Sequence, residues 1–421
     1  SDVCSSDLLN PDFFVQRIPR LLIIIDGMGD RPIVELGDKT PLQAANVPVL
    51  DSLAREGQCG VADPVKRGIV ATTVLGTLAI LGFDPLKHSI ARGVIEAHGS
   101  GMKIMPGDIA FRGNWATLDD AGKIVDRRAG RIREGTKELA SSLSGIKIED
   151  ASVEVGAGTE HRVAVVIRGA GLEDSLIGSD PGDHFHSGIK PRLPVALKQT
   201  DKKSVRTAKI LKLFEQEASK ILTLHPVNLE RVSKGLFAAN AILTREPGQV
   251  HAFPKIKRPS GLGLTGVCIS GDDTLSGISR VTGLDVCKTP AMTANLDTDL
   301  TEKFLLAGKM LSKYGVVVLH IKGCDIAAHN REAVKKKEFL EKIDAELGRF
   351  LKMWKAKLRI AVTADHATWS KEGVHVDDPV PVLLHGQGIS ADSVKGFDEF
   401  QASAGELGLF RLHKLWGKFF A

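Results

Sequence analysis

Three short apolar segments along the chain have the pattern of buried parallel strands. Each is rich in branched apolar side chains and is bounded by polar or glycine positions. Between them, apolar residues recur at helical spacing from Lys335 to Lys355, and a shorter helix is predicted from Val49 to Glu56. Strands that alternate with helices predict an α/β fold with a doubly wound sheet. The three strand-like segments are residues 21–25, 316–321 and 359–363.

The middle of the chain has a less regular pattern, with several glycines and short strand-like runs such as Arg162–Ile167. At 421 residues the chain is also longer than the roughly 250–300 residues that one core usually supports. We therefore expect a main domain of residues 18–90 and 260–421, with a smaller α+β domain of residues 91–259 inserted into it. Residues 1–17 carry no signal-peptide pattern, and we expect them to be disordered or adventitious.

The amino-acid composition limits the kinds of molecule that the protein is expected to bind. The net charge of +5 is spread along the sequence, which suits a small anionic substrate and gives no reason to expect nucleic acid. The five cysteines form no CxxC pair, so a reducing compartment such as the cytoplasm is expected. No apolar run approaches the roughly 18–20 residues of a membrane span, and no membrane partner is expected.

Carboxylates and imidazoles follow the three predicted strands. In open α/β sheets, ligands bind at the carboxyl ends of the strands, so these side chains predict one shared site. Asp325 and His329 are four residues apart, which a helix would place on one face, whereas His375 is expected in a glycine-containing loop. Mixed Asp and His ligation favours zinc, manganese or iron over calcium. The candidate ligands are Asp26, Asp325, His329, Asp365, His366 and His375.

Two neighbouring metal ions would have a definite chemistry. They clamp the attacking and leaving oxygens of an in-line phosphoryl displacement and lower the pKa of a bound nucleophile. Such a centre requires an oxygen nucleophile near Asp26 and Asp365.

Five strings occur in order along the chain: residues 25–32 (IDGMGDRP), 81–85 (LGFDP), 126–132 (DRRAGRI), 320–323 (HIKG) and 378–382 (DPVPV). Together they resemble the archaeal-type cofactor-independent phosphoglycerate mutases of the alkaline phosphatase superfamily, from about Leu21 to the C-terminus. The resemblance implies an alkaline-phosphatase-like α/β domain with an inserted substrate-binding domain. It also implies an isomerase that forms a phosphoserine and returns the phosphoryl group to a different hydroxyl of glycerate.

The resemblance further implies two divalent ions, manganese or zinc, with cobalt and magnesium as further candidates. One ion would be held by Asp325, His329 and His375, and the other by Asp26, Asp365 and His366 beside the nucleophile. Lys322, at the active end of a strand, is a further catalytic candidate. Basic residues expected to hold the phosphate and carboxylate of the substrate are Arg92, Arg112, Arg127, Arg128, Arg131, His161 and Arg162.

The nucleophile segment departs from this family pattern. Where the family has Gly-Ser-Asp, this chain has Thr72, Thr73 and Val74, so Thr73 occupies the position of the serine. A threonine hydroxyl can serve as nucleophile and metal ligand, although its methyl group restricts the rotamer. Thr72 is the rival nucleophile, and the side chain of Val74 can neither ligate nor hydrogen-bond.

The first hypothesis is therefore a metal-dependent phosphomutase that interconverts 3-phosphoglycerate and 2-phosphoglycerate through a phosphoenzyme. The second is a related metallo-phosphotransferase or hydrolase that acts on another phosphoester or phosphonate. The third is a catalytically inactive family member. A small phosphorylated anion is the expected partner, and the sequence leaves the oligomeric state open.

Overall fold

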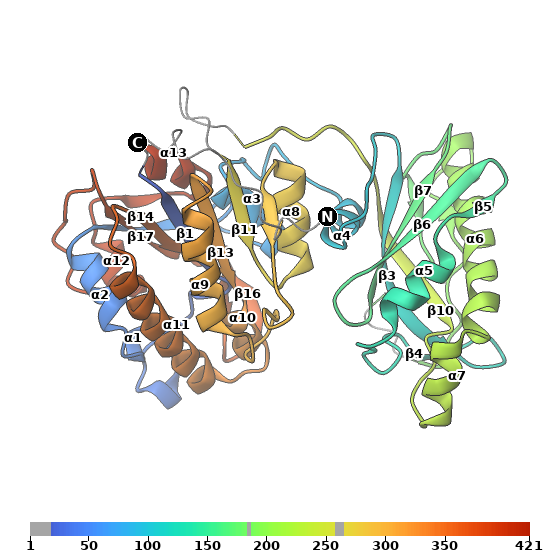
Figure 1. Cartoon of the computed structure of the whole chain (residues 1–421), viewed down its shortest axis with the longest axis horizontal. Helices are drawn as coiled ribbons and strands as arrows, with labels where there is room; N and C mark the ends of the chain where they lie inside the picture. The colour runs from blue at the N-terminus through green and yellow to red at the C-terminus, as the bar shows by residue number, and fades with distance from the viewer. Residues whose placement is uncertain (1–17, 183–186, 257–264) are drawn as a thin grey trace. The chain divides into compact units, whose positions relative to one another are not determined.

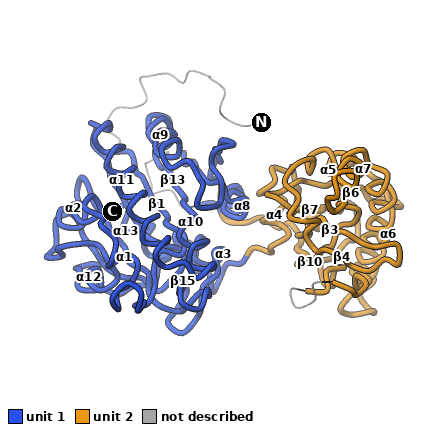
Figure 2. Tube along the Cα trace, turned by 90° about the horizontal axis from the view of Figure 1, so that it is seen from below, with its two compact units in different colours: residues 1–89, 255–421 blue, residues 90–254 orange. Residues whose placement is uncertain are grey.

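The structure, a computed structural model, describes residues 18–182, 187–256 and 265–421. The chain divides into two compact units (Figure 2). The first contains the described residues up to Ser89 and from Lys255 to Ala421, and the second contains Ile90–Pro254. The predicted N-terminal segment 1–17 and the predicted domain boundary at 259/260 lie outside the described residues.

The first unit is built on a mixed eight-stranded sheet with the strand order β12-β11-β13-β1-β14-β17-β2-β18 (Figure 1). The three predicted strands are confirmed as β1, β13 and β14, and β1 pairs in parallel with both of the others. Only β17 runs antiparallel to its two neighbours among the described strands of this sheet. The bounds are β1 (Arg20–Ile25), β2 (Gln58–Asp63), β11 (Gly266–Ile269), β12 (Asp285–Cys287), β13 (Val316–Ile321), β14 (Arg359–Thr363), β17 (Val380–Gly386) and β18 (Gly408–Arg411).

Helices connect these strands and cover the sheet. The crossovers through α8 and α9 move in opposite directions along the sheet, so right-handed connections place these two helices on opposite faces. The predicted long helix is confirmed as α11 and the short one as α2, each within two residues at its ends. The helices are α1 (Pro41–Ala44), α2 (Pro48–Arg55), α3 (Thr73–Ile80), α8 (Asp273–Thr282), α9 (Leu300–Leu311), α10 (Gly323–His329), α11 (Ala333–Met353), α12 (Glu399–Ser403) and α13 (Leu415–Phe420). A two-stranded sheet of β15 (Ala367–Trp369) and β16 (Val374–Val376) follows β14.

The second unit has an antiparallel sheet with the order β10-β3-β7-β6-β5, and β4 pairs with β3. Its core contains the aromatic side chains of Phe111, Trp115 and Phe214, packed among aliphatic residues of the sheet and of α5 and α6. The strands are β3 (Ile109–Leu118), β4 (Ile124–Asp126), β5 (Ile146–Ile148), β6 (Ala151–Ala157), β7 (Arg162–Arg168), β8 (Leu176–Ile177), β9 (Val195–Ala196) and β10 (Ala241–Gln249). The helices are α4 (Arg92–Gly99), α5 (Thr136–Leu143), α6 (Lys202–Thr223) and α7 (Pro226–Ser233).

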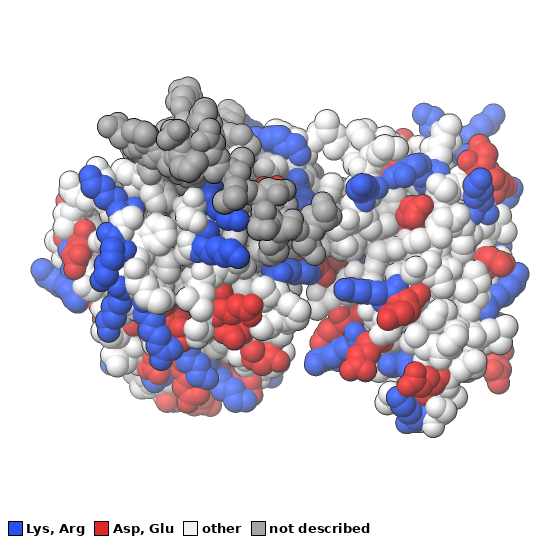
Figure 3. All heavy atoms as spheres, in the orientation of Figure 1, with Lys and Arg blue, Asp and Glu red and all other residues white. Residues whose placement is uncertain are grey.

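The predicted α/β fold with a smaller α+β part is thus confirmed. In the part of the chain that the structure describes, no helix combines the length and the hydrophobicity that a membrane span requires. Basic side chains lie beside acidic ones over both units on the face that Figure 3 shows, as the spread of charge along the sequence predicts.

Candidate functional site

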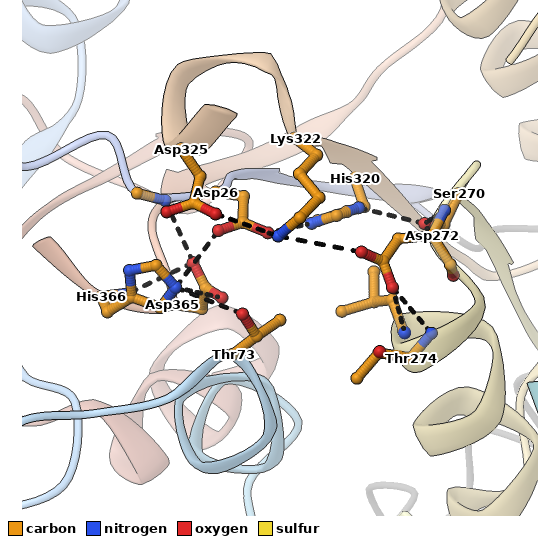
Figure 4. A network of polar contacts seen from close by, with 12 residues as sticks. Asp26, Thr73, Ser270, Asp272, Thr274, His320, Lys322, Asp325, Asp365 and His366 are labelled. Atoms are coloured by element: carbon orange, nitrogen blue, oxygen red, sulfur yellow. Dashed lines mark hydrogen bonds and ion pairs between the residues drawn. The ribbon is translucent and has the colours of Figure 1, made fainter. Parts of the chain in front are cut away.

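The carboxyl ends of β1, β13 and β14 bring the predicted acidic and imidazole side chains together (Figure 4). Asp26 directly follows β1, Asp365 and His366 come just after β14, and Asp325 lies in the first turn of α10 after β13. All four residues are buried. Because β1 pairs with both β13 and β14, adjacent parallel strands deliver these groups to one edge of the sheet.

Asp26 and Asp365 each have one oxygen held by the protein and one left without a hydrogen-bond partner. In Asp26, Oδ2 accepts hydrogen bonds from His320 at 3.0 Å and Lys322 at 2.8 Å, and Oδ1 accepts none. In Asp365, Oδ1 accepts from the backbone N–H groups of Gly27 and His366, and Oδ2 accepts none. The two unpartnered oxygens lie 3.2 and 3.3 Å from Nε2 of His366.

The side chains of the second predicted set of metal ligands also lie close together. Oδ1 of Asp325 lies 3.3 Å from Nε2 of His329 and 3.5 Å from Nε2 of His375, and these two nitrogens are 3.1 Å apart. The helix prediction for Asp325 and His329 is confirmed by α10, but His375 lies in strand β16 and not in a loop. His366 is also close enough to share a cation with Asp325 and His375, so this residue lies between the two sets.

The three histidines present the same nitrogen to the site. Nδ1 of His329 lies 2.7 Å from the carbonyl oxygen of Gly373, and Nδ1 of His375 lies 2.9 Å from that of Ala71. Since a carbonyl oxygen only accepts hydrogen bonds, both rings carry a proton on Nδ1. Their Nε2 atoms therefore keep a lone pair and face the carboxylates, as metal-binding imidazoles do.

Three buried carboxyl groups lie close together at this site, and their pKa values are shifted. Burial raises the pKa of Asp365 well above its usual range, and the charge of Asp26 adds to this shift. Burial is the largest influence on Asp26 and Asp325 too and opposes their ionisation. The ammonium group of Lys322 and contacts with neighbouring histidines together outweigh it and hold the pKa of both carboxyl groups below the usual range. One ammonium group thus neutralises only part of a buried cluster of three carboxyl groups.

These residues fit divalent cations. The site offers carboxylate oxygens without donors and imidazole lone pairs, and burying such groups unpaired is costly. A cation bound by oxygen and nitrogen ligands removes that cost, and the Asp and His donor set is typical of transition-metal sites.

The two candidate nucleophiles differ clearly in position. Thr72 is exposed and is the N-cap of α3, where its hydroxyl accepts a hydrogen bond from the N–H of Leu75. Thr73 is the first residue of α3, and its Oγ1 lies 3.3 Å from Nε2 of His366 (Figure 4). A side chain at Gly76 would place its Cβ 1.9 Å from the carbonyl oxygen of Asp365, so this glycine allows α3 to approach the site closely.

Lys322 bridges the two ligand sets. Its Nζ donates to Oδ2 of Asp26 and, at 3.1 Å, to Oδ2 of Asp325, and it lies 3.8 Å from the carboxylate of Asp272. His320 is one further polar neighbour that the sequence did not single out, although it lies two residues before Lys322 in the HIKG string. It is buried between Asp26 and the hydroxyl of Ser270, at 3.0 Å from each (Figure 4).

In the second unit, several of the predicted basic residues surround His161. This side chain is buried, and neither of its ring nitrogens has a hydrogen-bond partner. Burial, and to a lesser extent the nearby positive charges, lower the pKa of His161 to about 3. Burial and its arginine neighbours also lower the pKa of Arg162 to about 10. The arginines close enough to act on one or the other of these two groups are Arg92, Arg112, Arg128, Arg131, Arg162 and Arg245.

Two acidic residues balance part of this basic cluster. Glu96 lies 3.0 Å from Arg112 and 4.0 Å from Arg92, and Glu246 pairs with the same two arginines. Arg162 donates to the amide oxygen of Asn114. The cluster therefore has more donors than acceptors, which suits a bound anion.

Arg127 differs from the other predicted arginines because its Nε and Nη2 donate to the carboxylate of Asp180, and both residues are buried. Arg245, which the sequence did not single out, contacts the same carboxylate. Such a paired guanidinium fits a supporting role better than direct contact with a substrate.

The loop that carries Arg128 and Arg131 is strained. The turn has successive φ angles of 45° at Ala129, 66° at Gly130 and 55° at Arg131. Residues other than glycine rarely adopt φ angles in this range. Arg231 donates to the carbonyl oxygen of Ala129 and helps to hold this turn. Strain of this kind persists where the surrounding structure enforces it and is concentrated at functional sites.

An α/β sheet that gathers unpartnered carboxylate oxygens, imidazole lone pairs and a hydroxyl at one edge defines the class of metal-dependent α/β enzymes. A family model described as 2,3-bisphosphoglycerate-independent phosphoglycerate mutase matches residues 54–228. A protein of that name from Archaeoglobus fulgidus is 41% identical over 395 residues, covering 93% of this chain and 94% of the relative. Another from Picrophilus torridus is 39% identical over 387 residues, covering 92% and 93%.

Solved structures agree with these matches. The cofactor-independent phosphoglycerate mutase from Thermoplasma acidophilum is 33% identical and covers 95% of this chain and 98% of its own, with a TM-score of 0.67. A protein from Pyrococcus horikoshii is 30% identical and covers 96% and 97%, with a TM-score of 0.79. This chain belongs to the 2,3-bisphosphoglycerate-independent phosphoglycerate mutase family.

Proposed function

We propose that this chain is a metal-dependent isomerase that interconverts 3-phosphoglycerate and 2-phosphoglycerate through a phosphothreonine at Thr73. The proposal is carried by the position of that hydroxyl, 3.3 Å from Nε2 of His366, where the carboxylates and imidazoles meet. Thr72 is the weaker candidate because its hydroxyl already caps α3.

The same proposal assigns the cation ligands. Asp26, Asp365 and His366 would hold one divalent cation, and Asp325, His329 and His375 the other, with His366 near enough to serve either. When bound, two such cations lower the pKa of the threonine hydroxyl and neutralise charge on the transferring phosphoryl group. Lys322 would keep the carboxylates of Asp26 and Asp325 apart and oriented.

The protein residues then carry out two displacements. Oγ1 of Thr73 loses its proton and forms a bond to phosphorus as the bond to one glycerate oxygen breaks, and that oxygen takes up a proton. The other glycerate hydroxyl then loses its proton and forms a bond to phosphorus as the bond to Oγ1 of Thr73 breaks, and Oγ1 takes up a proton again. We assign Arg92, Arg112, Arg128, Arg131, Arg162 and His161 to substrate binding, and Arg127 to support of this cluster through Asp180.

The test follows phosphoryl transfer directly. The metal-free protein is loaded with Mn²⁺, 3-phosphoglycerate is added, and 2-phosphoglycerate is measured in the parent, in Thr73→Ala, in Thr73→Ser and in Thr72→Ala. We expect activity in the parent and in Thr73→Ser, and a loss of at least about 10³-fold in Thr73→Ala, because this variant lacks the nucleophile. Thr72→Ala should lose only the stability of one helix cap, about 1 kcal/mol.

Mass spectrometry of the acid-quenched parent should locate a phosphoryl group on Thr73. A phosphoryl group on Thr72, or full activity in Thr73→Ala, would refute the assignment of the nucleophile.

A second candidate function is favoured by Val74, whose buried apolar side chain adjoins the nucleophile and offers no ligand. A related hydrolase or transferase that acts on another phosphoester or phosphonate would be compatible with this change. Release of inorganic phosphate without formation of 2-phosphoglycerate would identify that function.

A further inference from the structure

Thr368 lies behind the ligand cluster and is held rigidly in place. It is in the middle of β15 and is fully buried. Its backbone N–H donates to the carbonyl oxygen of Gly29 at 2.9 Å, and its own carbonyl oxygen accepts from Nζ of the buried Lys336 at 3.0 Å. The position of its hydroxyl is therefore fixed by the backbone on both sides.

This hydroxyl contacts one residue of each ligand set. Oγ1 of Thr368 lies 2.9 Å from Oδ1 of Asp325 and 3.1 Å from Nδ1 of His366. The ionised carboxylate of Asp325 only accepts hydrogen bonds, so the single hydroxyl proton is donated to it. The hydroxyl must then accept from His366, which places a proton on Nδ1 and leaves the lone pair of Nε2 facing Asp26 and Asp365.

The backbone leaves room for this contact at Gly27. This glycine has a φ of 64°, and a Cβ built on it would lie 2.7 Å from Oγ1 of Thr368 and 2.9 Å from Cβ of Asp325. Any side chain there would push apart the two residues that share the hydrogen bond. The turn after β1 is thus shaped around the hydroxyl as well as around Asp26.

The other two histidines are oriented differently. Nδ1 of His329 and Nδ1 of His375 each donate to a backbone carbonyl oxygen, and each of these oxygens orients one ring only. Nδ1 of His366 instead donates to the side chain of Thr368, which also holds Asp325 of the other set. Of the three partners, only Thr368 can be removed by a side-chain substitution that leaves the backbone unchanged.

We propose that Thr368 is a positioning residue that couples the two cation sites, because one hydroxyl orients Asp325 in one set and His366 in the other. This inference rests on the two-cation centre of the proposed function. Loss of the hydroxyl would release both ligands together. Groups of this kind, one step removed from the metal, typically contribute about 10- to 100-fold in metal affinity.

The test is calorimetric titration of the metal-free full-length chain with Mn²⁺. We expect two ions per parent chain, and about 10- to 100-fold weaker binding at both sites in Thr368→Val, which keeps the shape but lacks the hydroxyl. Thr368→Ser keeps the hydroxyl and should bind within about threefold of the parent. Circular dichroism of each metal-free variant checks that it is folded.

A second measurement needs no variant of Thr368. The ¹⁵N shifts of the His366 ring in the metal-free parent, assigned by comparison with His366→Asn, should show the proton on Nδ1. A proton on Nε2 would overturn the inference.

The outcomes separate the two proposals. Two ions in the parent with unchanged binding in Thr368→Val, or weakening at one site alone, would overturn the coupling and leave the two-cation centre intact. A parent chain that binds no Mn²⁺ would instead refute the centre on which the proposed function depends.

Discussion

The sheet edge of the first unit and the basic cluster of the second have opposite chemistries. At the sheet edge, Asp26 and Asp365 each keep a buried oxygen without a donor. In the basic cluster, both ring nitrogens of His161 are without hydrogen-bond partners, and arginines outnumber the acids that pair with them. One region thus accumulates acceptors, which cations satisfy, and the other accumulates donors, which anions satisfy.

The two regions are also supported differently. The sheet edge rests on regular parallel strands, whose pairing register places the proposed cation ligands. The basic cluster depends on a turn with three successive positive φ angles and on the buried pair of Arg127 and Asp180. Each region thus gives up some stability of the free protein in order to bind a ligand of opposite charge.

The largest expected effect comes from removing a ligand at the sheet edge. Asp365→Asn should lower mutase activity by about 10³-fold or more, because it removes an unpartnered carboxylate from the transition-state environment. The metal-free variant should melt at a higher temperature than the parent, since it loses one of three crowded carboxyl groups. Coupled activity assays and calorimetry test both effects.

The matched control for this variant is Asp120→Asn, the same change at an exposed position of the second unit. Activity of Asp365→Asn within tenfold of the parent would contradict the assignment of this residue to the centre.

The next effect concerns the approach of α3. Gly76→Ala would place a methyl carbon 1.9 Å from the carbonyl oxygen of Asp365, so the helix must move away. A displacement of about 1 Å at a reacting group costs on the order of 10²-fold in rate, and we expect kcat to fall by that amount while Mn²⁺ still binds.

Gly417→Ala, in α13, is the control for this substitution, because a Cβ there meets nothing within 4 Å. If Gly76→Ala retained the parent kcat, Thr73 would not depend on the close packing of α3.

A smaller effect is expected in the basic cluster. Arg128→Met should lower kcat/KM by about 10- to 100-fold, the value of one charge-assisted hydrogen bond to an anion, without loss of Mn²⁺ binding. Steady-state kinetics measure the change, and Arg349→Met, at an exposed surface position, is the control. Unchanged kcat/KM would mean that this part of the cluster does not contact the substrate.

The smallest effect is on stability alone. Burial raises the pKa of Glu215 on α6 to about 8, while two hydroxyls, of Ser179 and Thr244, donate to its carboxyl group. The folded state therefore binds more protons than the unfolded state between pH 4.5 and pH 8. Its contribution is complete at low pH and is lost as pH rises through this window, by at most about 1.4 kcal/mol per pH unit.

Glu215→Gln should remove this dependence, whereas Glu217→Gln, at a half-buried position on the same helix, should keep it. Denaturant unfolding at pH 5, 6.5 and 8 provides the measurement. Parallel pH profiles for Glu215→Gln and the parent would contradict the assignment.

Much of the fold was predictable from the sequence because its signals are local. The strands β1, β13 and β14 are continuous apolar runs, and α11 repeats its apolar residues at helical spacing. Asp325 and His329 were also placed correctly on one helix, since four residues make about one turn. The strand position of His375 was missed, because β16 has only three residues and exists through its pairing with β15.

The parallel strands and the kinds of side chain that follow them were evident from the amino-acid sequence alone, because both depend on residues close together in the chain. The sequence did not reveal that Thr368 hydrogen-bonds to both Asp325 and His366. Nor did it reveal that Thr72 caps the helix while Thr73 faces the site. The ion pair between Arg127 and Asp180 was not evident from it either. Those roles depend on contacts between residues distant in sequence. A threonine or an arginine looks the same in the sequence whether its side chain binds a ligand or another residue of the protein. Only the tertiary structure decides which hydrogen bonds each of these groups makes.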